Sequence, residues 1–156
     1  MPAARPTTTI AGYGLRALRE AGGEETSRFE ATLVREGVDV ALVSNGGTGG
    51  SHLYRWIDGV EQDRFEQAAT EWNAAGEFAG LEDGDQLVNR FIECSALSRM
   101  RKTPFLLGTD GSFWETGQCR QLDRVVDRET LVAWLHREHP SARVWDAAAG
   151  DFVRVG

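Results

Sequence analysis

One stretch decides the fold of this chain: FEATLVREGVDVAL, residues 29–42. In its first half, Phe29, Ala31 and Leu33 alternate with polar residues, and the alternation resumes after a break at residues 35–37. A period of two is typical of a strand with one buried face, and a short break that contains glycine is typical of a hairpin turn. The stretch therefore predicts an antiparallel β-hairpin.

The predicted hairpin leads directly into a glycine-rich loop, NGGTGGS, residues 45–51. Glycine adopts positive φ without strain, so such a loop can direct several backbone N–H groups toward one point. The loop lacks the Gly-Lys-Ser/Thr end of a P-loop, and its spacing does not fit a dinucleotide-binding turn. Two interpretations stay open: the loop binds an anion, or it is a long hairpin connection.

Alternation returns after the loop, in residues 52–58, and predicts a strand with His52, Tyr54 and Trp56 on one face. These side chains can form walls around a planar ligand, with hydrogen-bond donors at its edge. Alternatively, the two aromatic rings simply pack under a helix.

Two arginines, Arg99 and Arg101, lie at the end of a predicted helix and can supply positive charge to the same ligand. Cations there also complement the helix dipole without any ligand. We expect the site to bind a small anion, a nucleotide or another phosphorylated molecule, with the loop N–H groups on its phosphate. The predicted ligand-binding residues are Asn45, Gly46, Gly47, Thr48, Gly49, Gly50, Ser51, His52, Tyr54, Trp56, Arg99 and Arg101.

Helical spacing of apolar residues occurs in four segments: residues 15–21, 65–72, 83–100 and 127–139. The first segment is short, so about three helices are expected to pack on the sheet. Gly76 is expected to end the second segment as a C-cap, and Asp83 and Asp127 are expected to begin the third and fourth as N-caps.

Strand-like segments return at residues 103–108 and 113–122, with short strands around Val144 and Phe152. Local strand pairs with helices inserted between them predict an α+β fold with a largely antiparallel sheet built from hairpins. We expect a single domain over residues 1–156 with a flexible N-terminal tail at residues 1–12.

The composition argues against several classes of protein. Of the 156 residues, 41% are hydrophobic and 26% are charged, which is ordinary for a globular protein and argues against disorder. No apolar run approaches the ~20 residues that cross a bilayer, and the N-terminus has no signal-peptide core, so no membrane partner is expected.

The net charge of −7 makes nucleic acid an unfavourable partner. Two cysteines do not make a disulfide framework, which favours a cytoplasmic location with two reduced thiols.

Neither a metal nor a cofactor is expected. His136 and His139 are three residues apart on one predicted helix, as in some metal sites. No cysteine or carboxylate pattern elsewhere completes a ligand set.

The residues for catalysis are equally sparse. The conceivable nucleophiles, each with His52 as the base, are Cys94, Cys119, Ser44 and Ser51. None of them lies in a nucleophile elbow. Whether the protein is an enzyme is left open, and the sequence favours that it is not.

Three segments resemble a group of small uncharacterised proteins of bacteria and their phages: Val43-Ser44-Asn45-Gly46-Gly47-Thr48-Gly49-Gly50, Lys102-Thr103-Pro104-Phe105-Leu106, and the helix that leads to His139-Pro140. The resemblance implies a compact cytoplasmic α+β protein, with an origin in a phage or another mobile element, and it implies no activity.

Three functions are consistent with these observations. The leading one is a small cytoplasmic binding module for a phosphorylated ligand at residues 45–52. The second is a protein-interaction factor in which an acidic surface meets a partner protein and the loop is only a connection. The third is a small hydrolase or transferase that uses His52 as acid or base.

Overall fold

The computed structural model describes residues 8–156, which divide into two compact units. The first unit is Thr9–Ile92, and the second joins Thr8 to Glu93–Gly156. The single domain stays a prediction. Of the predicted tail, residues 1–7 lie outside the described part, whereas Thr8 donates a hydrogen bond to the Ala147 carbonyl at 2.8 Å.

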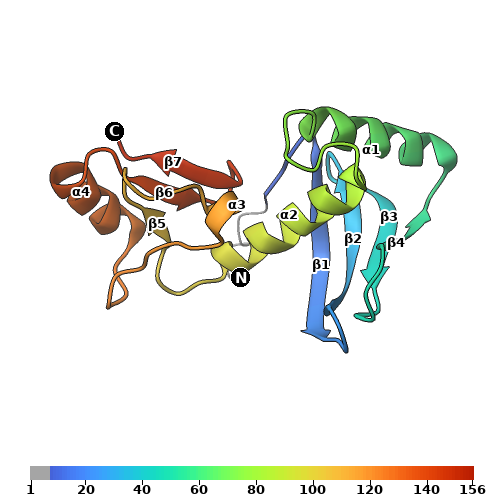
Figure 1. The fold of residues 1–156 in the computed structure, drawn as a ribbon, viewed down its shortest axis with the longest axis horizontal. Helices are drawn as coiled ribbons and strands as arrows, with labels where there is room; N and C mark the ends of the chain where they lie inside the picture. Colours follow the sequence, from blue (N-terminus) through green and yellow to red (C-terminus); the bar gives the residue numbers. More distant parts are fainter. Residues whose placement is uncertain (1–7) are drawn as a thin grey trace. The chain divides into compact units, whose positions relative to one another are not determined.

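The first unit is built on a four-stranded antiparallel sheet in the order β1-β2-β3-β4 (Figure 1). Its strands are β1 (Tyr13–Gly22), β2 (Ser27–Arg35), β3 (Val38–Asn45) and β4 (Leu53–Trp56). The predicted hairpin is confirmed, because β2 and β3 pair with Phe29 opposite Asn45 and Leu33 opposite Ala41. The strand after the glycine-rich loop is also present and is shorter than predicted.

Residues 15–21 form part of β1, so the helix predicted there is wrong. The register of β1 against β2 shifts around Ala17, which has a φ of 56°, and this marks a β-bulge. A bulge adds one residue to a strand, so Leu15 and Leu18 both pack against the core although they are three positions apart. That spacing is typical of a helix, and here an irregular strand produces it.

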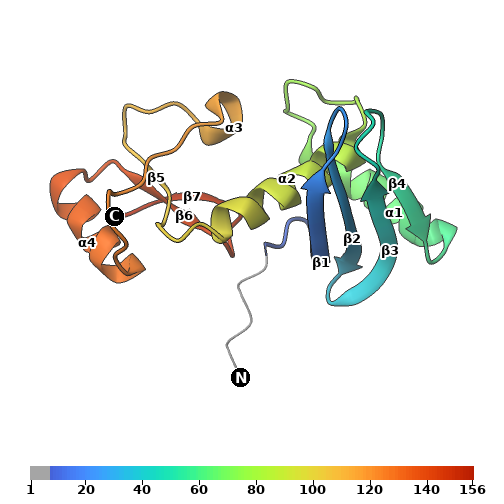
Figure 2. The same ribbon diagram turned by 90° about the horizontal axis from the view of Figure 1, so that it is seen from below.

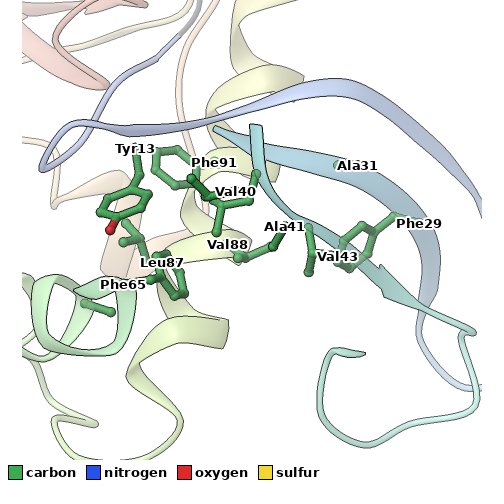
Figure 3. Close-up of a cluster of buried hydrophobic side chains, with 12 residues drawn as sticks. Tyr13, Phe29, Ala31, Val40, Ala41, Val43, Phe65, Leu87, Val88 and Phe91 are labelled. Atoms are coloured by element: carbon green, nitrogen blue, oxygen red, sulfur yellow. The ribbon is translucent and has the colours of Figure 1, made fainter. Parts of the chain in front are cut away.

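The core of the first unit lies between this sheet and two helices, α1 (Gly59–Trp72) and the N-terminal part of α2 (Asp83–Ser98). Figure 3 shows the side chains that meet there. Phe29 comes from the sheet, Phe65 from α1, and Leu87 and Phe91 from α2, and all four are buried. Since successive strand residues point to opposite faces, the second face of the sheet is turned away from the helices.

The C-terminal end of α1 differs from the prediction. The Asp58 carboxylate accepts a hydrogen bond from the Glu61 N–H at 2.8 Å, so the helix begins at Gly59. It ends at Trp72 with Asn73 as C-cap, not at Gly76, because the buried Asn73 amide donates to the Asp83 carboxylate at 2.7 Å. Asp83 is the first residue of α2 rather than its cap.

The second unit contains a three-stranded antiparallel sheet in the order β5-β6-β7 (Figure 2). The strands are β5 (Phe105–Leu106), β6 (Arg143–Asp146) and β7 (Asp151–Arg154), and the helices are α3 (Phe113–Thr116), α4 (Arg128–Glu138) and the C-terminal part of α2. The predicted cap of α4 is confirmed, because the Asp127 carboxylate accepts from the Thr130 N–H at 2.7 Å. That backbone hydrogen bond lowers the pKa of Asp127.

Residues 113–122 do not form the predicted strand. Their first part is α3, a single helical turn in which the Ser112 hydroxyl accepts from the Trp114 N–H. Gly117 ends the turn with a φ of 70°. Beyond it, one isolated bridge between Arg120 and Phe105 is described. The local turn and its cap therefore override the weak alternation of the sequence.

The fold is α+β with antiparallel sheets, as predicted. Within residues 8–156 the strands form two sheets rather than one, and four helices accompany them. No helix in that range is long and apolar enough to cross a membrane.

Candidate functional site

The glycine-rich loop is folded around the side chain of Asn45, which is only 7% exposed. The Asn45 Oδ1 atom accepts a hydrogen bond from the Gly47 N–H at 2.9 Å. Its Nδ2 atom donates to the Gly50 carbonyl at 3.2 Å and lies 3.1 Å from the His52 Nδ1 atom. One amide therefore ties both ends of the loop together, and the Gly47 N–H is used within the protein.

Gly47 also packs against the turn that joins β1 to β2. Its carbonyl accepts hydrogen bonds from the Glu25 N–H at 2.8 Å and the Thr26 N–H at 3.1 Å. Its φ is 79°, and a Cβ atom added there would lie 2.7 Å from the Gly23 Cα atom. Only glycine fits such a contact, so the structure explains this glycine by packing alone.

His52 is held on both sides of its ring. Its Nε2 atom lies 2.7 Å from the Asn89 Oδ1 atom, and Asn45 approaches Nδ1 on the other side. Assigning the protons from these partners gives a neutral imidazole that accepts from Asn45 and donates to Asn89. The ring also packs against Phe29 in a T-shaped arrangement, with 4.8 Å between the ring centroids. These contacts give His52 a role in positioning the loop.

Tyr54 and Trp56 share one face of β4, as predicted, and their rings are stacked with centroids 5.4 Å apart. Both rings also lie beside Phe65 of α1. The Tyr54 hydroxyl donates to the Asp85 carboxylate at 2.6 Å. Burial raises the pKa of Tyr54, and the hydrogen bond to Asp85 raises it further. Tyr54 is therefore a neutral donor at any physiological pH.

These aromatic rings lie beside a hollow of about 430 Å³, which we call the acidic hollow. Four carboxylates line it, from Glu66 of α1 and from Glu82, Asp83 and Asp85 at the start of α2, and its described lining contains no arginine or lysine. Its lining residues are Ser51, His52, Tyr54, Trp56, Gln62, Phe65, Glu66, Thr70, Glu82, Asp83, Gly84 and Asp85.

Two of the four carboxylates are fully engaged in holding the structure. Asp85 accepts from the Tyr54 hydroxyl and, at 2.9 Å, from the His52 N–H. Asp83 accepts from the Asn73 amide and the Gly80 N–H, and these bonds lower the pKa of Asp83. The lowered pKa keeps Asp83 negatively charged.

The other two carboxylates, Glu66 and Glu82, are exposed at the rim of the hollow. Glu66 accepts from the Gln62 amide at 3.3 Å, and Glu82 accepts from the Ser51 hydroxyl. They are the acidic groups that a ligand in the hollow can reach from solvent.

The hydrogen-bond partners described for the His52 ring are Asn45 and Asn89, and none of the candidate nucleophiles is among them. Ser44 lies on the outward face of the sheet, opposite Leu53, and the Ser51 hydroxyl donates to Glu82. Cys94 and Cys119 belong to the second unit, and neither is in a disulfide bond. Burial raises the pKa of Cys119, which makes its thiol less reactive. Within residues 8–156, no group of three His, Cys, Asp or Glu side chains is placed to hold a metal ion.

The predicted ligand-binding residues divide into two sets. The ten between Asn45 and Trp56 lie together in the loop and in β4. Arg99 and Arg101 follow α2 and belong to the second unit. Neither arginine is among the residues that line the acidic hollow.

The sequence analysis missed the residues that α1 and α2 contribute. Asp85 and Asn89 are four positions apart and therefore share one helix face, which is a signal that the sequence does contain. The sequence does not show which strand this helix face packs against. Of the acidic residues at the start of α2, only Asp83 was assigned a role from the sequence, as an N-cap.

Comparisons with known proteins give no relative. No protein-family model matches the chain, and no curated protein or solved structure matches it. Function is therefore inferred from the residues around the acidic hollow.

Proposed function

We propose that the first unit is a binding module for a small organic cation, which it holds in the acidic hollow. The observation that carries this proposal is the stacked pair Tyr54 and Trp56 beside four carboxylates. Aromatic faces attract ammonium and guanidinium groups, and carboxylates supply the charge that such groups pair with. A volume of about 430 Å³ is within the range of small-molecule sites.

The charge of the hollow favours a cation over the phosphorylated ligand that the loop predicts. Four negative groups around one cavity repel phosphate at short range. The Gly47 N–H, which was expected to bind phosphate, donates to Asn45 instead. The phosphorylated ligand stays a prediction, with less support than a cation.

The ligand is expected to meet the rim first. Glu66 and Glu82 are exposed, so a cation can pair with one or both of them without breaking the hydrogen bonds of Asp83 and Asp85. The planar or aliphatic body of the ligand is then expected to lie against the Tyr54 and Trp56 pair. This arrangement favours a primary amine or a guanidinium on a flat or extended carbon body.

Binding without catalysis is the better interpretation of His52. Both ring nitrogens have amide partners, and the carboxylate of Asp85 contacts its backbone rather than its ring. A general base needs a free acceptor nitrogen within reach of a substrate proton. The cytoplasmic location expected from the sequence stays a prediction.

The test is a calorimetric titration of benzylammonium, which carries a primary ammonium on a planar ring, into the full chain. The wild type is expected to bind it, and the double variant Glu66→Gln with Glu82→Gln is expected to bind roughly 2- to 30-fold more weakly. Each exposed charge pair contributes about 0.2–1 kcal/mol, and two such pairs are removed.

A matched control is the double variant Glu71→Gln with Glu77→Gln, which removes the same charge from exposed positions outside the hollow. Its affinity for benzylammonium should stay close to that of the wild type. If both double variants lost the same affinity for benzylammonium, the loss would be due to net charge alone and the proposal would be contradicted. A wild type that gives no saturable heat would also contradict it.

A further inference from the structure

The outward face of the four-stranded sheet is a second surface with a composition of its own. The core side chains of the sheet point toward α1 and α2, so their strand neighbours point away. We call this surface the outer face. Its side chains are Arg16, Arg19, Arg28, Glu30, Thr32, Val34, Asp39, Leu42, Ser44, Leu53 and Arg55.

The outer face is hollowed rather than flat. A depression of about 620 Å³ is lined by residues of all four strands, including Arg19, Leu42 and Arg55. A second depression of about 460 Å³ continues from it past Arg28 and shares Arg19 and Leu53 with the first. The bulge around Ala17 bends β1 at the side of the larger depression. Together the two depressions form a groove across the strands.

The charge of the outer face is opposite to that of the whole chain. Its side chains include four guanidinium groups and two carboxylates, and the Glu20 carboxylate also lines the second depression, whereas the protein has a net charge of −7. Arg16 pairs with Asp39 at 2.6 Å, and Arg19 lies 3.9 Å from Glu30. Arg28 and Arg55 are two further cations beside these ion pairs, so the face has an excess of positive charge.

Two aliphatic side chains lie between these charges. Leu42 is 52% exposed and Leu53 is 69% exposed, and both point into the groove. Large aliphatic side chains on the open face of a sheet lose solvent contact only when something covers them. Cations around an apolar centre are complementary to a ligand that carries carboxylates around an aliphatic segment.

We propose that the outer face binds an acidic peptide segment of a partner protein, with aliphatic side chains on Leu42 and Leu53 and carboxylates on Arg19, Arg28 and Arg55. None of the side chains of the described outer face is aromatic, so it lacks the stacking platform on which single-stranded nucleic acids bind. This inference is independent of the acidic hollow, which lies on the opposite face of the sheet.

The test is a selection from a phage-displayed library of random twelve-residue peptides against the immobilised full chain. Selected peptides are expected to be enriched in Asp and Glu next to Leu, Ile or Val. A synthetic copy of the most enriched peptide should bind the wild type and lose at least tenfold in affinity for the double variant Arg19→Glu with Arg55→Glu. Both positions are exposed, so this variant is expected to fold.

The matched control is the double variant Arg101→Glu with Arg124→Glu, which makes the same charge change at exposed positions of the second unit. It should retain the affinity of the wild type within about twofold. Leu53→Ser tests the apolar contact separately. This variant should lower the affinity for the same peptide without changing the net charge of the protein.

Four outcomes would overturn the proposal. Selected peptides without acidic enrichment, or peptides bound equally by the two double variants, would remove the charge argument. Tighter binding of a ten-nucleotide oligothymidine than of the peptide would make the surface a nucleic-acid site. Sedimentation of the wild type as a dimer that Leu53→Ser converts to a monomer would show that a second copy of this chain covers the face.

Discussion

At the scale of single residues, the glycines of the loop are not equivalent. Gly47 has a φ of 79° and a backbone neighbour 2.7 Å from the position of an added Cβ atom. Gly50 has a φ of 89° with open space around it, and Gly46 has neither a positive φ nor a close neighbour. Three glycines that look alike in the sequence thus meet three different physical demands.

We therefore expect graded effects of alanine substitution on the free energy of unfolding. Gly46→Ala should change it by less than about 0.5 kcal/mol, and Gly50→Ala should lower it by about 1–2 kcal/mol through the left-handed backbone. Gly47→Ala should cost more than Gly50→Ala, because it adds a clash with the turn between β1 and β2. Urea unfolding of the three variants measures this order, and equal losses at Gly47 and Gly50 would show that the contact with Gly23 is absent.

At the scale of elements, side-chain pairs hold segments that have little regular structure. After β5, the Asp110 carboxylate accepts from the Leu107 N–H at 2.8 Å and from two nitrogens of Arg120 at 2.6 and 2.9 Å. The Arg120 hydrogen bonds and the Leu107 N–H lower the pKa of Asp110 to about 2. The loop that contains α3 is closed by this pair.

The lowered pKa makes the contribution of Asp110 to stability depend on pH. An Asp in the unfolded chain has a pKa of about 3.9, so the folded state keeps Asp110 charged where the unfolded state binds a proton. Its contribution is complete above about pH 4 and is lost as the pH falls toward 2. The difference in free energy of unfolding between wild type and Asp110→Asn should therefore shrink between pH 5 and pH 2.

Urea unfolding at several pH values measures that difference. Asp123→Asn is the matched control, since Asp123 is exposed and offers its backbone carbonyl to Lys102. A difference for Asp110→Asn that stays constant across this pH range would show that its pKa is not lowered.

Elements with a regular pattern could be predicted from the sequence. The hairpin of β2 and β3 was found because Phe29, Ala31 and Leu33 alternate without interruption, and α4 was found through its Asp127 cap. β1 was mistaken for a helix because its bulge puts two leucines three positions apart. α3 was mistaken for a strand because a single turn is too short for periodicity to show.

The candidate site could be predicted only in part, because only some of its residues belong to a local sequence pattern. The loop and β4 were located because glycines and alternating aromatic residues are local signals. The carboxylates of α1 and α2 reach the hollow through tertiary packing, which no local pattern contains. The sequence therefore predicts the loop and β4 as part of a site, whereas it gives no sign of the acidic groups that line the hollow. The roles of Arg99 and Arg101 stay a prediction.

At the scale of the whole molecule, the net charge of −7 conceals an uneven distribution in the first unit. Its sheet carries an excess of arginine on the outer face and borders four carboxylates on the other. A single sheet can thus present two surfaces that attract ligands of opposite charge. Net charge alone describes neither surface.

The central claim is that the acidic hollow selects a cation, and two ligands of matched shape test it most directly. Benzylammonium and benzyl phosphate share a ring and differ in the sign of their charge, so each can be titrated into uniformly ¹⁵N-labelled protein while amide chemical shifts are followed. We predict that benzylammonium shifts the amides of Ser51, His52, Tyr54, Gly84 and Asp85 in a saturable way and that benzyl phosphate leaves them unchanged. Saturable shifts of residues 45–52 by benzyl phosphate, without a response to benzylammonium, would contradict the account and restore the anion that the glycine-rich loop predicts.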